Sequence, residues 1–134
     1  MMTVPALSPL AAALYVALGG ATGSVARYFM GQAITSMMGA NSYPWAILGI
    51  NTLGSLAMGL LFGWFASQDG GTETQRLLFA VGMLGGFTTF SAFSFEIVLM
   101  IQRGAIGMAA FFIAASVIAG VAALYCGLTL MKDA

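Results

Sequence analysis

Residues 82–95 read Gly-Met-Leu-Gly-Gly-Phe-Thr-Thr-Phe-Ser-Ala-Phe-Ser-Phe, and they lie in the middle of a long hydrophobic segment. This stretch combines four phenylalanine rings with four side-chain hydroxyls. Because unpaired polar groups cost roughly several kcal/mol in hydrocarbon, such a cluster belongs against protein or a pore rather than against lipid. We therefore expect this segment to have a function inside the membrane, and transport is the function that it favours most.

The composition of the whole chain sets its class. Of 134 residues, 60% are hydrophobic and 6% are charged, the formal net charge is zero and histidine is absent. A water-soluble domain carries roughly a quarter charged residues, so this composition indicates an integral membrane protein in a lipid bilayer. The zero net charge argues against a polybasic surface, and no nucleic-acid partner is expected. The one cysteine, Cys126, lies in an apolar run, where packing is its expected role.

Four hydrophobic spans follow one another, each long enough for a bilayer core that requires about 20 helical residues. Short polar turns separate them. Thr72 and Gln75 have capping-box spacing, and Pro44 suits the first turn of a helix. We predict an all-α membrane protein with a single domain over residues 1–134. Its four transmembrane helices are expected at about residues 10–38, 45–66, 77–101 and 106–131.

The centre of the third span is poor helix-forming sequence. Gly85 and Gly86 are followed by Thr88 and Thr89, and a double glycine at mid-membrane favours unwinding. Where a span unwinds within protein, its backbone carbonyls lose their helical partners and become available to a cation. We therefore predict that the third helix is broken near Gly85–Thr89.

Beyond the glycines, aromatic and hydroxyl side chains run side by side. Phe90 and Phe93 lie three residues apart and share a helix face, and Ser91 and Ser94 have the same spacing. The positive edge of an aromatic ring attracts an anion without a full charge. Phenylalanines at this spacing are usually core or lipid contacts, but rings, hydroxyls and a glycine pair in one membrane segment are rarer.

Three more polar residues lie inside the spans. Asn51 is deep in the second, and its amide suits either an anion or a bond to another helix. Arg27 is late in the first, where snorkelling to the interface competes with a functional role. Glu96 either pairs with Arg27 or lies near the membrane surface. Arg27 and Glu96 are therefore candidates for a structural role.

Small residues recur four apart along the spans, as in Gly19 with Gly23 and Gly59 with Gly63. This spacing lets helix backbones approach closely in lipid, and tight packing within one subunit is its ordinary meaning. Four helices enclose little volume, so a pore within one copy is not expected. An oligomer, most simply a twofold dimer, is predicted.

Basic residues divide two against two between the sides of the membrane. Arg76 and Lys132 fall on the side of the N-terminus, and Arg27 and Arg103 fall opposite. The positive-inside rule then gives almost no preferred orientation. A chain that inserts both ways can form an antiparallel homodimer, although a few charges also balance by chance.

These motifs resemble the fluoride channels called Fluc or CrcB over nearly all of the chain. The resemblance rests on residues 19–28 and 51–55, and most specifically on residues 82–96. It implies a fluoride-selective channel that exports fluoride passively from the cell, as a multi-pass protein of the inner or plasma membrane. It also implies an antiparallel, dual-topology homodimer with two pores. A structural sodium ion at the dimer interface would be held by the backbone carbonyls of Gly85 and Thr88.

The resemblance also implies roles along the fluoride path. Asn51 would donate to fluoride, Phe90 and Phe93 would form an aromatic box, and a hydroxyl track on the fourth span would include Ser116. With the two serines of the third span, the predicted pore residues are Asn51, Phe90, Phe93, Ser91, Ser94 and Ser116.

The chain departs from the family pattern at five positions. Phe112 stands where a tyrosine is frequent, and Gly120 and Leu124 stand where some members carry hydroxyls. In the second span, a frequent Gly-Thr pair reads Ala46-Ile47. We therefore expect the outer parts of the fluoride path to be lined differently in this chain.

Two other functions stay open. A proton-coupled small multidrug exporter shares the size, the four helices and the antiparallel dimer, but it relies on an acid in its first helix, and the first span here has none. A non-transporting membrane assembly protein would use the polar strip to join subunits. An enzyme is not expected, because the sequence offers no histidine, nucleophile–base pair or metal-ligand cluster.

Overall fold

The computed structural model of the chain describes residues 6–132, and every regular element in that range is helical. The elements in order are α1 (Pro9–Met38), the 3-10 turn η1 (Ala40–Ser42), α2 (Tyr43–Ser67), α3 (Glu73–Gln75), the π-helical η2 (Arg76–Leu84), α4 (Gly85–Phe87), α5 (Phe90–Gln102) and α6 (Ile106–Lys132). Four stretches are long and apolar enough to cross a membrane: Pro9–Met38, Ala40–Ser67, Glu73–Gln102 and Ile106–Lys132. The prediction of four apolar helices in an all-α chain is confirmed.

The outer surface of these helices is apolar. Large exposed side chains occur on every span, such as Leu14, Trp45, Phe95 and Ile118. A soluble monomer rarely exposes an apolar patch larger than about a few hundred Å². In a membrane, the hydrocarbon core of the bilayer solvates such a surface. The protein is a multi-pass membrane protein.

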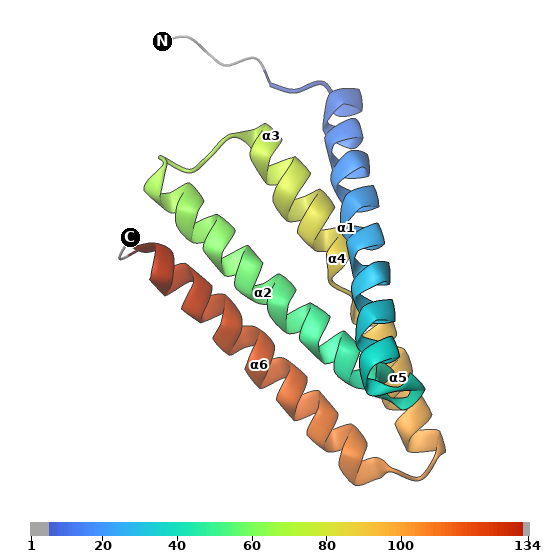
Figure 1. Cartoon of the computed structure of the whole chain (residues 1–134). Coiled ribbons are helices and arrows are strands. Elements are labelled where there is room, and N and C mark those ends of the chain that lie inside the picture. Colours follow the sequence, from blue (N-terminus) through green and yellow to red (C-terminus); the bar gives the residue numbers. More distant parts are fainter. Residues whose placement is uncertain (1–5, 133–134) are drawn as a thin grey trace.

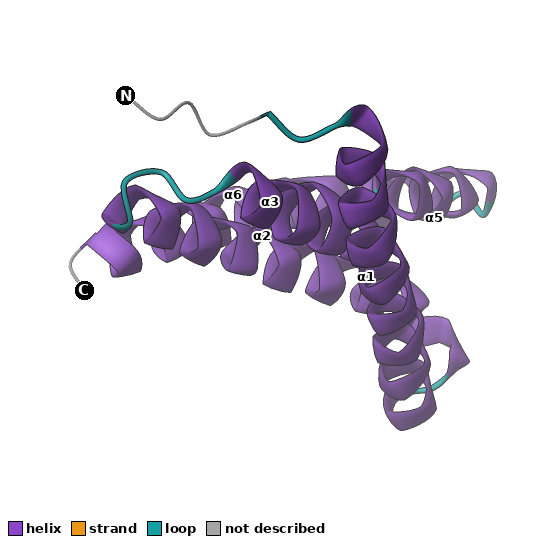
Figure 2. Ribbon diagram, turned by 90° about the horizontal axis from the view of Figure 1, so that it is seen from above, coloured by secondary structure: helices purple, strands orange, loops and turns teal. Residues whose placement is uncertain are grey.

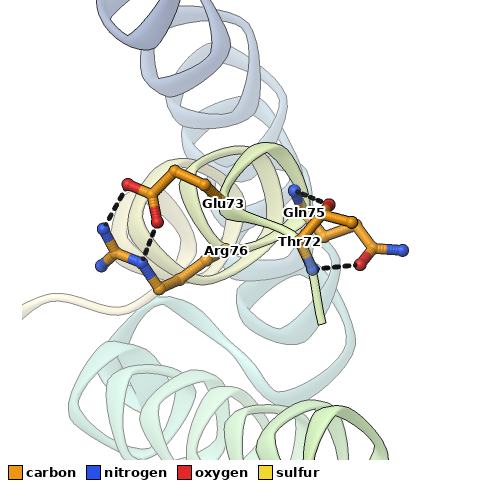
Figure 3. A network of polar contacts seen from close by, with 4 residues as sticks. All are labelled: Thr72, Glu73, Gln75 and Arg76. Carbon is orange, nitrogen blue, oxygen red and sulfur yellow. Dashed lines mark hydrogen bonds and ion pairs between the residues drawn. The ribbon is translucent and has the colours of Figure 1, made fainter. Parts of the chain in front are cut away.

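The helix starts follow signals in the sequence. The Thr72 hydroxyl accepts a hydrogen bond from the Gln75 amide at 3.2 Å, and the Gln75 side chain accepts one from the Thr72 amide at 2.9 Å (Figure 3). The predicted capping box is thus confirmed. Glu73 and Arg76 form a two-armed, exposed ion pair on the same turn. Pro44 lies in the first turn of α2, as predicted.

Helices α2 and α6 lie side by side and run in the same direction (Figure 1). Their backbones touch at glycines, since a Cβ on Gly59 would meet the carbonyl oxygen of Leu124 and one on Gly127 would meet that of Leu56. Seen from above, α1 crosses this pair steeply (Figure 2). The buried apolar core fills the angle between α2, α5 and α6, and its main residues are Ile47, Met100, Ala109 and Phe112.

Helix α1 meets the third span without intervening side chains. Its buried residues are Gly19, Gly23 and Gly31. A Cβ on Gly19 would meet the Leu78 carbonyl oxygen, and one on Gly23 would meet that of Met83. In lipid, where burial of apolar surface gives no drive to associate, this close van der Waals contact holds the two spans together.

The third span changes geometry along its length. It is π-helical from Arg76 to Leu84, and α4 ends at Phe87. Thr88 and Thr89 then have extended backbones, with ψ of 156° and 122°, before α5 begins. Gly85 itself is helical at φ −62° and ψ −39°.

The glycine pair next to these threonines has a packing role. A Cβ on Gly86 would lie 2.6 Å from the carbonyl oxygen of Gly20 on α1. The pair was expected to favour unwinding. In the structure Gly85 and Gly86 are helical, and the absent side chain of Gly86 lets α1 approach.

The contact between α1 and the third span predicts the outcome of a glycine substitution. Gly23→Ala places a methyl group against the Met83 backbone and should destabilise the folded protein by about 1–3 kcal/mol through overpacking. Gly49→Ala is the matched control, because a Cβ at Gly49 meets nothing within 4 Å. Thermal unfolding midpoints in detergent measure the difference. Equal midpoints for the two variants would contradict direct backbone contact at Gly23.

Candidate functional site

An open groove of about 360 Å³ lies between α2, α5 and α6. It gathers residues from three distant parts of the sequence, and no charged side chain lines it within the described range. Its polar and aromatic lining includes Asn51, Ser55, Thr88, Phe90, Phe93 and Ser116. The structure therefore brings four of the predicted pore residues, Asn51, Phe90, Phe93 and Ser116, into one cavity.

Asn51 ties α2 to the extended backbone of the third span. Its Nδ2 donates to the Thr89 carbonyl oxygen at 3.0 Å, and its Oδ1 accepts from the Thr89 amide at 2.8 Å. These two partners fix the orientation of the side-chain amide, since the carbonyl can meet only Nδ2 and the N–H can meet only Oδ1. One N–H of Asn51 is left over for another acceptor, and the residue lines the groove.

Two backbone carbonyls of this segment lose their usual helical donors. In a continuous helix, the Thr89 amide would donate to the Gly85 carbonyl, but here it donates to Asn51. The Ala92 amide would donate to the Thr88 carbonyl, but here it donates to the Thr89 hydroxyl at 3.2 Å. Gly85 and Thr88 therefore carry carbonyls without their usual helical donors, which is the chemistry that a monovalent cation requires. Among the described residues, no cluster of three or more His, Cys, Asp or Glu side chains could hold a metal ion.

Two aromatic rings border the groove. The ring centroids of Phe90 and Phe93 lie 5.7 Å apart at 42°. Phe93 also packs on Phe112, at 5.5 Å, and is anchored in the core in this way. Phe90 lines the groove and is 79% exposed, so its ring faces both the groove and the outer surface of the subunit.

The hydroxyl of Ser116 is buried and has no hydrogen-bond partner in the described part of the chain. The hydroxyl of Thr52 shares this property. By contrast, Thr22, Thr35 and Ser94 each donate to a carbonyl of their own helix. An unsatisfied buried hydroxyl costs about 1–3 kcal/mol. Ser116 lines the groove and Thr52 does not, so a ligand or water in the groove can reach the Ser116 hydroxyl.

Thr88, a predicted sodium-site residue, also lines this groove, whereas Ser91, Ser94, Gly85 and Glu96 do not. Ser94 donates to the Phe90 carbonyl at 2.9 Å, and the exposed Ser91 lies 3.3 Å from the Thr89 hydroxyl. Glu96 is buried on α5. The ion pair found among residues 6–132 is Glu73 with Arg76, so Glu96 is not paired with Arg27.

Arg27 lines a second groove of about 360 Å³ between α1 and α2. Its neighbours there carry several hydroxyl, amide and phenol groups. They include Ser24, Tyr28, Gln32, Thr35 and Tyr43.

The five departures from the family pattern fall into two groups. Ala46, Ile47 and Phe112 are fully buried in the core and do not line the groove with Asn51. Gly120 and Leu124 do line it. The substitutions that change the groove itself are therefore on α6.

Sequence reasoning missed two parts of this site. Ser55 lines the groove, and its position four residues after Asn51 places it on the same helix face, a signal that was available in the sequence. The backbone of Thr89, which is the partner of Asn51, carried no such signal.

Removal of the Asn51 side chain should loosen the extended segment. Asn51→Ala leaves the buried N–H and C=O of Thr89 without partners, at a cost of about 1–3 kcal/mol for each group. Amide hydrogen exchange should therefore accelerate in a peptide that spans residues 86–92. Gln32→Ala is the matched control, because the Gln32 amide bonds an exposed tyrosine hydroxyl on its own helix. Unchanged exchange in Asn51→Ala would show that these bonds do not hold the segment.

Comparison with known proteins adds independent information. Residues 14–128 match the family described as "CrcB-like protein, Camphor Resistance (CrcB)". A protein of Novosphingobium aromaticivorans named "Fluoride-specific ion channel FluC" is 50% identical over 124 residues, which cover 92% of this chain and 98% of that protein. A protein with the same name from Erythrobacter litoralis is 48% identical over 98% of this chain and 98% of its own length. Another, from Rhodospirillum centenum, is 46% identical over 90% of this chain and 95% of its own length. The match confirms the resemblance found in the sequence, and the chain belongs to the CrcB family.

Proposed function

We propose that the protein is a fluoride-selective channel that lets fluoride leave the cell passively across the plasma membrane. The observation that carries this proposal is the uncharged groove in which a spare Asn51 N–H, two phenylalanine rings and an unpaired Ser116 hydroxyl converge. It agrees with the names of the relatives, which are fluoride-specific ion channels. An ion channel is not an enzyme, in agreement with the expectation from the sequence.

The chemistry of the groove suits a small, strongly hydrated anion. Amide and hydroxyl donors replace hydration water one at a time, and the positive edges of Phe90 and Phe93 add weak attraction. None of these groups carries a full charge. The ion can therefore enter and also leave, whereas a lysine at the same place would hold it too tightly for conduction.

The groove is open along one side, and a second copy of the chain is the proposed cover. Phe90, at 79% exposure, projects from a groove that one subunit leaves unfinished. The even division of basic residues permits both orientations, so we propose an antiparallel, dual-topology homodimer. A twofold axis then produces two equivalent grooves and hence two pores.

A sodium ion is the proposed structural cofactor at the dimer interface. The carbonyls of Gly85 and Thr88 would hold it, because Asn51 and the Thr89 hydroxyl have taken their helical donors. When bound, the ion supplies local positive charge to a site that otherwise has none and joins the interrupted spans of the two subunits.

The alternative functions are less well supported. An exporter that uses an acid in its first helix is disfavoured, since Pro9–Met38 contains no aspartate or glutamate. A non-transporting assembly protein gives no role to the spare Asn51 N–H and the Ser116 hydroxyl, which line one groove. Ion flux decides between it and a channel.

Fluoride efflux from proteoliposomes tests the pore residues. Phe90→Ile and Asn51→Ala should each lower the rate about tenfold, because the first removes an aromatic ring edge and the second removes an amide donor to the ion. Phe95→Ile is the matched control, since Phe95 is exposed on the same helix and does not line the groove. A fluoride electrode reports the rate, with chloride as the comparison ion. Full efflux in Phe90→Ile or Asn51→Ala would refute this pore.

Replacement of sodium tests the proposed cofactor. Protein that is purified and reconstituted with a large organic cation in place of sodium should lose fluoride flux and regain it when sodium is added back. Potassium serves as a control for ionic strength. Flux that is independent of sodium throughout, in protein with sodium removed as checked by elemental analysis, would contradict a structural sodium ion.

A further inference from the structure

We infer that Ser55 is a further residue of the fluoride path, one helical turn beyond Asn51, and that the absence of a side chain at Gly120 gives its hydroxyl access to the groove. This inference rests on the proposed function. It adds a residue that the predicted pore set does not contain.

The alignment of α2 and α6 places donors at successive levels of the groove. The oxygen Oγ of Ser55 lies 3.5 Å from the point where a Cβ on Gly120 would stand, and Gly59 meets Leu124 one turn later. The same offset puts Asn51 level with Ser116. Since four helical residues rise about 6 Å, the Ser55 hydroxyl lies about that distance along the groove from the Asn51 level.

The far end of the groove is apolar. Beyond Ser55 on α2 the lining residue is Met58, and beyond Gly120 on α6 it is Leu124. Neither side chain donates a hydrogen bond to an anion. Ser55 is therefore the last side-chain donor along these two helices before the apolar end, where an ion that has left Asn51 still requires a replacement for its water.

Gly120 decides which helix supplies the hydroxyl at this level. A Cβ there would be in ordinary van der Waals contact with Ser55, so a small side chain can be accommodated. With Gly120 present, α6 contributes no polar group and Ser55 is the donor. A hydroxyl placed on α6 at the same level should be able to take over its role.

A hydroxyl exchange tests this inference. Ser55→Ala should lower fluoride efflux about tenfold, because it removes one hydrogen bond to a charged ion and little volume. Ser55→Ala combined with Gly120→Ser returns a hydroxyl to the same level from the other helix and should restore efflux to within about threefold of the wild type. Ser67→Ala is the matched control, since the exposed Ser67 hydroxyl bonds the Trp64 carbonyl at the end of α2.

A structural role for Ser55 predicts a different result. In that case Ser55→Ala would change the elution profile or the thermal midpoint of the protein, and adding Gly120→Ser would not restore the fluoride flux. If Ser55→Ala does not fold, Ser55→Cys keeps the size with a weak donor and should show the same loss of flux. Folded Ser55 variants with the efflux of Ser67→Ala, or a folded double variant no faster than the single one, would overturn the inference. Wild-type protein without fluoride flux would overturn the proposed function as well.

Discussion

The bidentate contact between the Asn51 amide and the backbone of Thr89 is the interaction on which the site depends. It joins α2 to the one place where the third span is extended, and it satisfies a backbone donor and acceptor that would otherwise be buried without partners. It also removes the usual donor of the Gly85 carbonyl and aims the remaining Asn51 N–H. A single side chain therefore shapes both the groove and the proposed cation site, which gives a polar residue a structural role deep in an apolar helix.

The glycines provide the second constraint. A side chain at Gly23 or Gly86 would separate α1 from the third span, and a side chain at Gly59 would separate α2 from α6. In both contacts the two helix backbones touch directly. Small residues permit this close packing, which contact with lipid does not provide. The contact at Gly59 thus holds two walls of the groove, α2 and α6, at a set spacing, although Gly59 itself does not line the groove.

The sequence was sufficient for some features because they depend on local signals. The four spans follow from hydropathy, and the Thr72 capping box and the place of Pro44 follow from short-range hydrogen bonding and backbone geometry. The closeness of Asn51 to Phe90 came from family resemblance rather than from periodicity. The partner of Asn51, the packing role of Gly86 and the place of Ser55 depend on which helix faces meet. That register is a tertiary property, and local propensity does not encode it.

The π-helix η2 uses nine residues to cover an axial distance that an α-helix would cover with fewer residues. Loss of one residue there can be absorbed if a wide turn tightens to α geometry, and the residues on either side keep their facing. In α2 or α6, which are regular throughout, the same loss would rotate every later side chain by about 100° and take Ser55 or Ser116 out of line. Within the spans, length variation between related channels should therefore concentrate in η2.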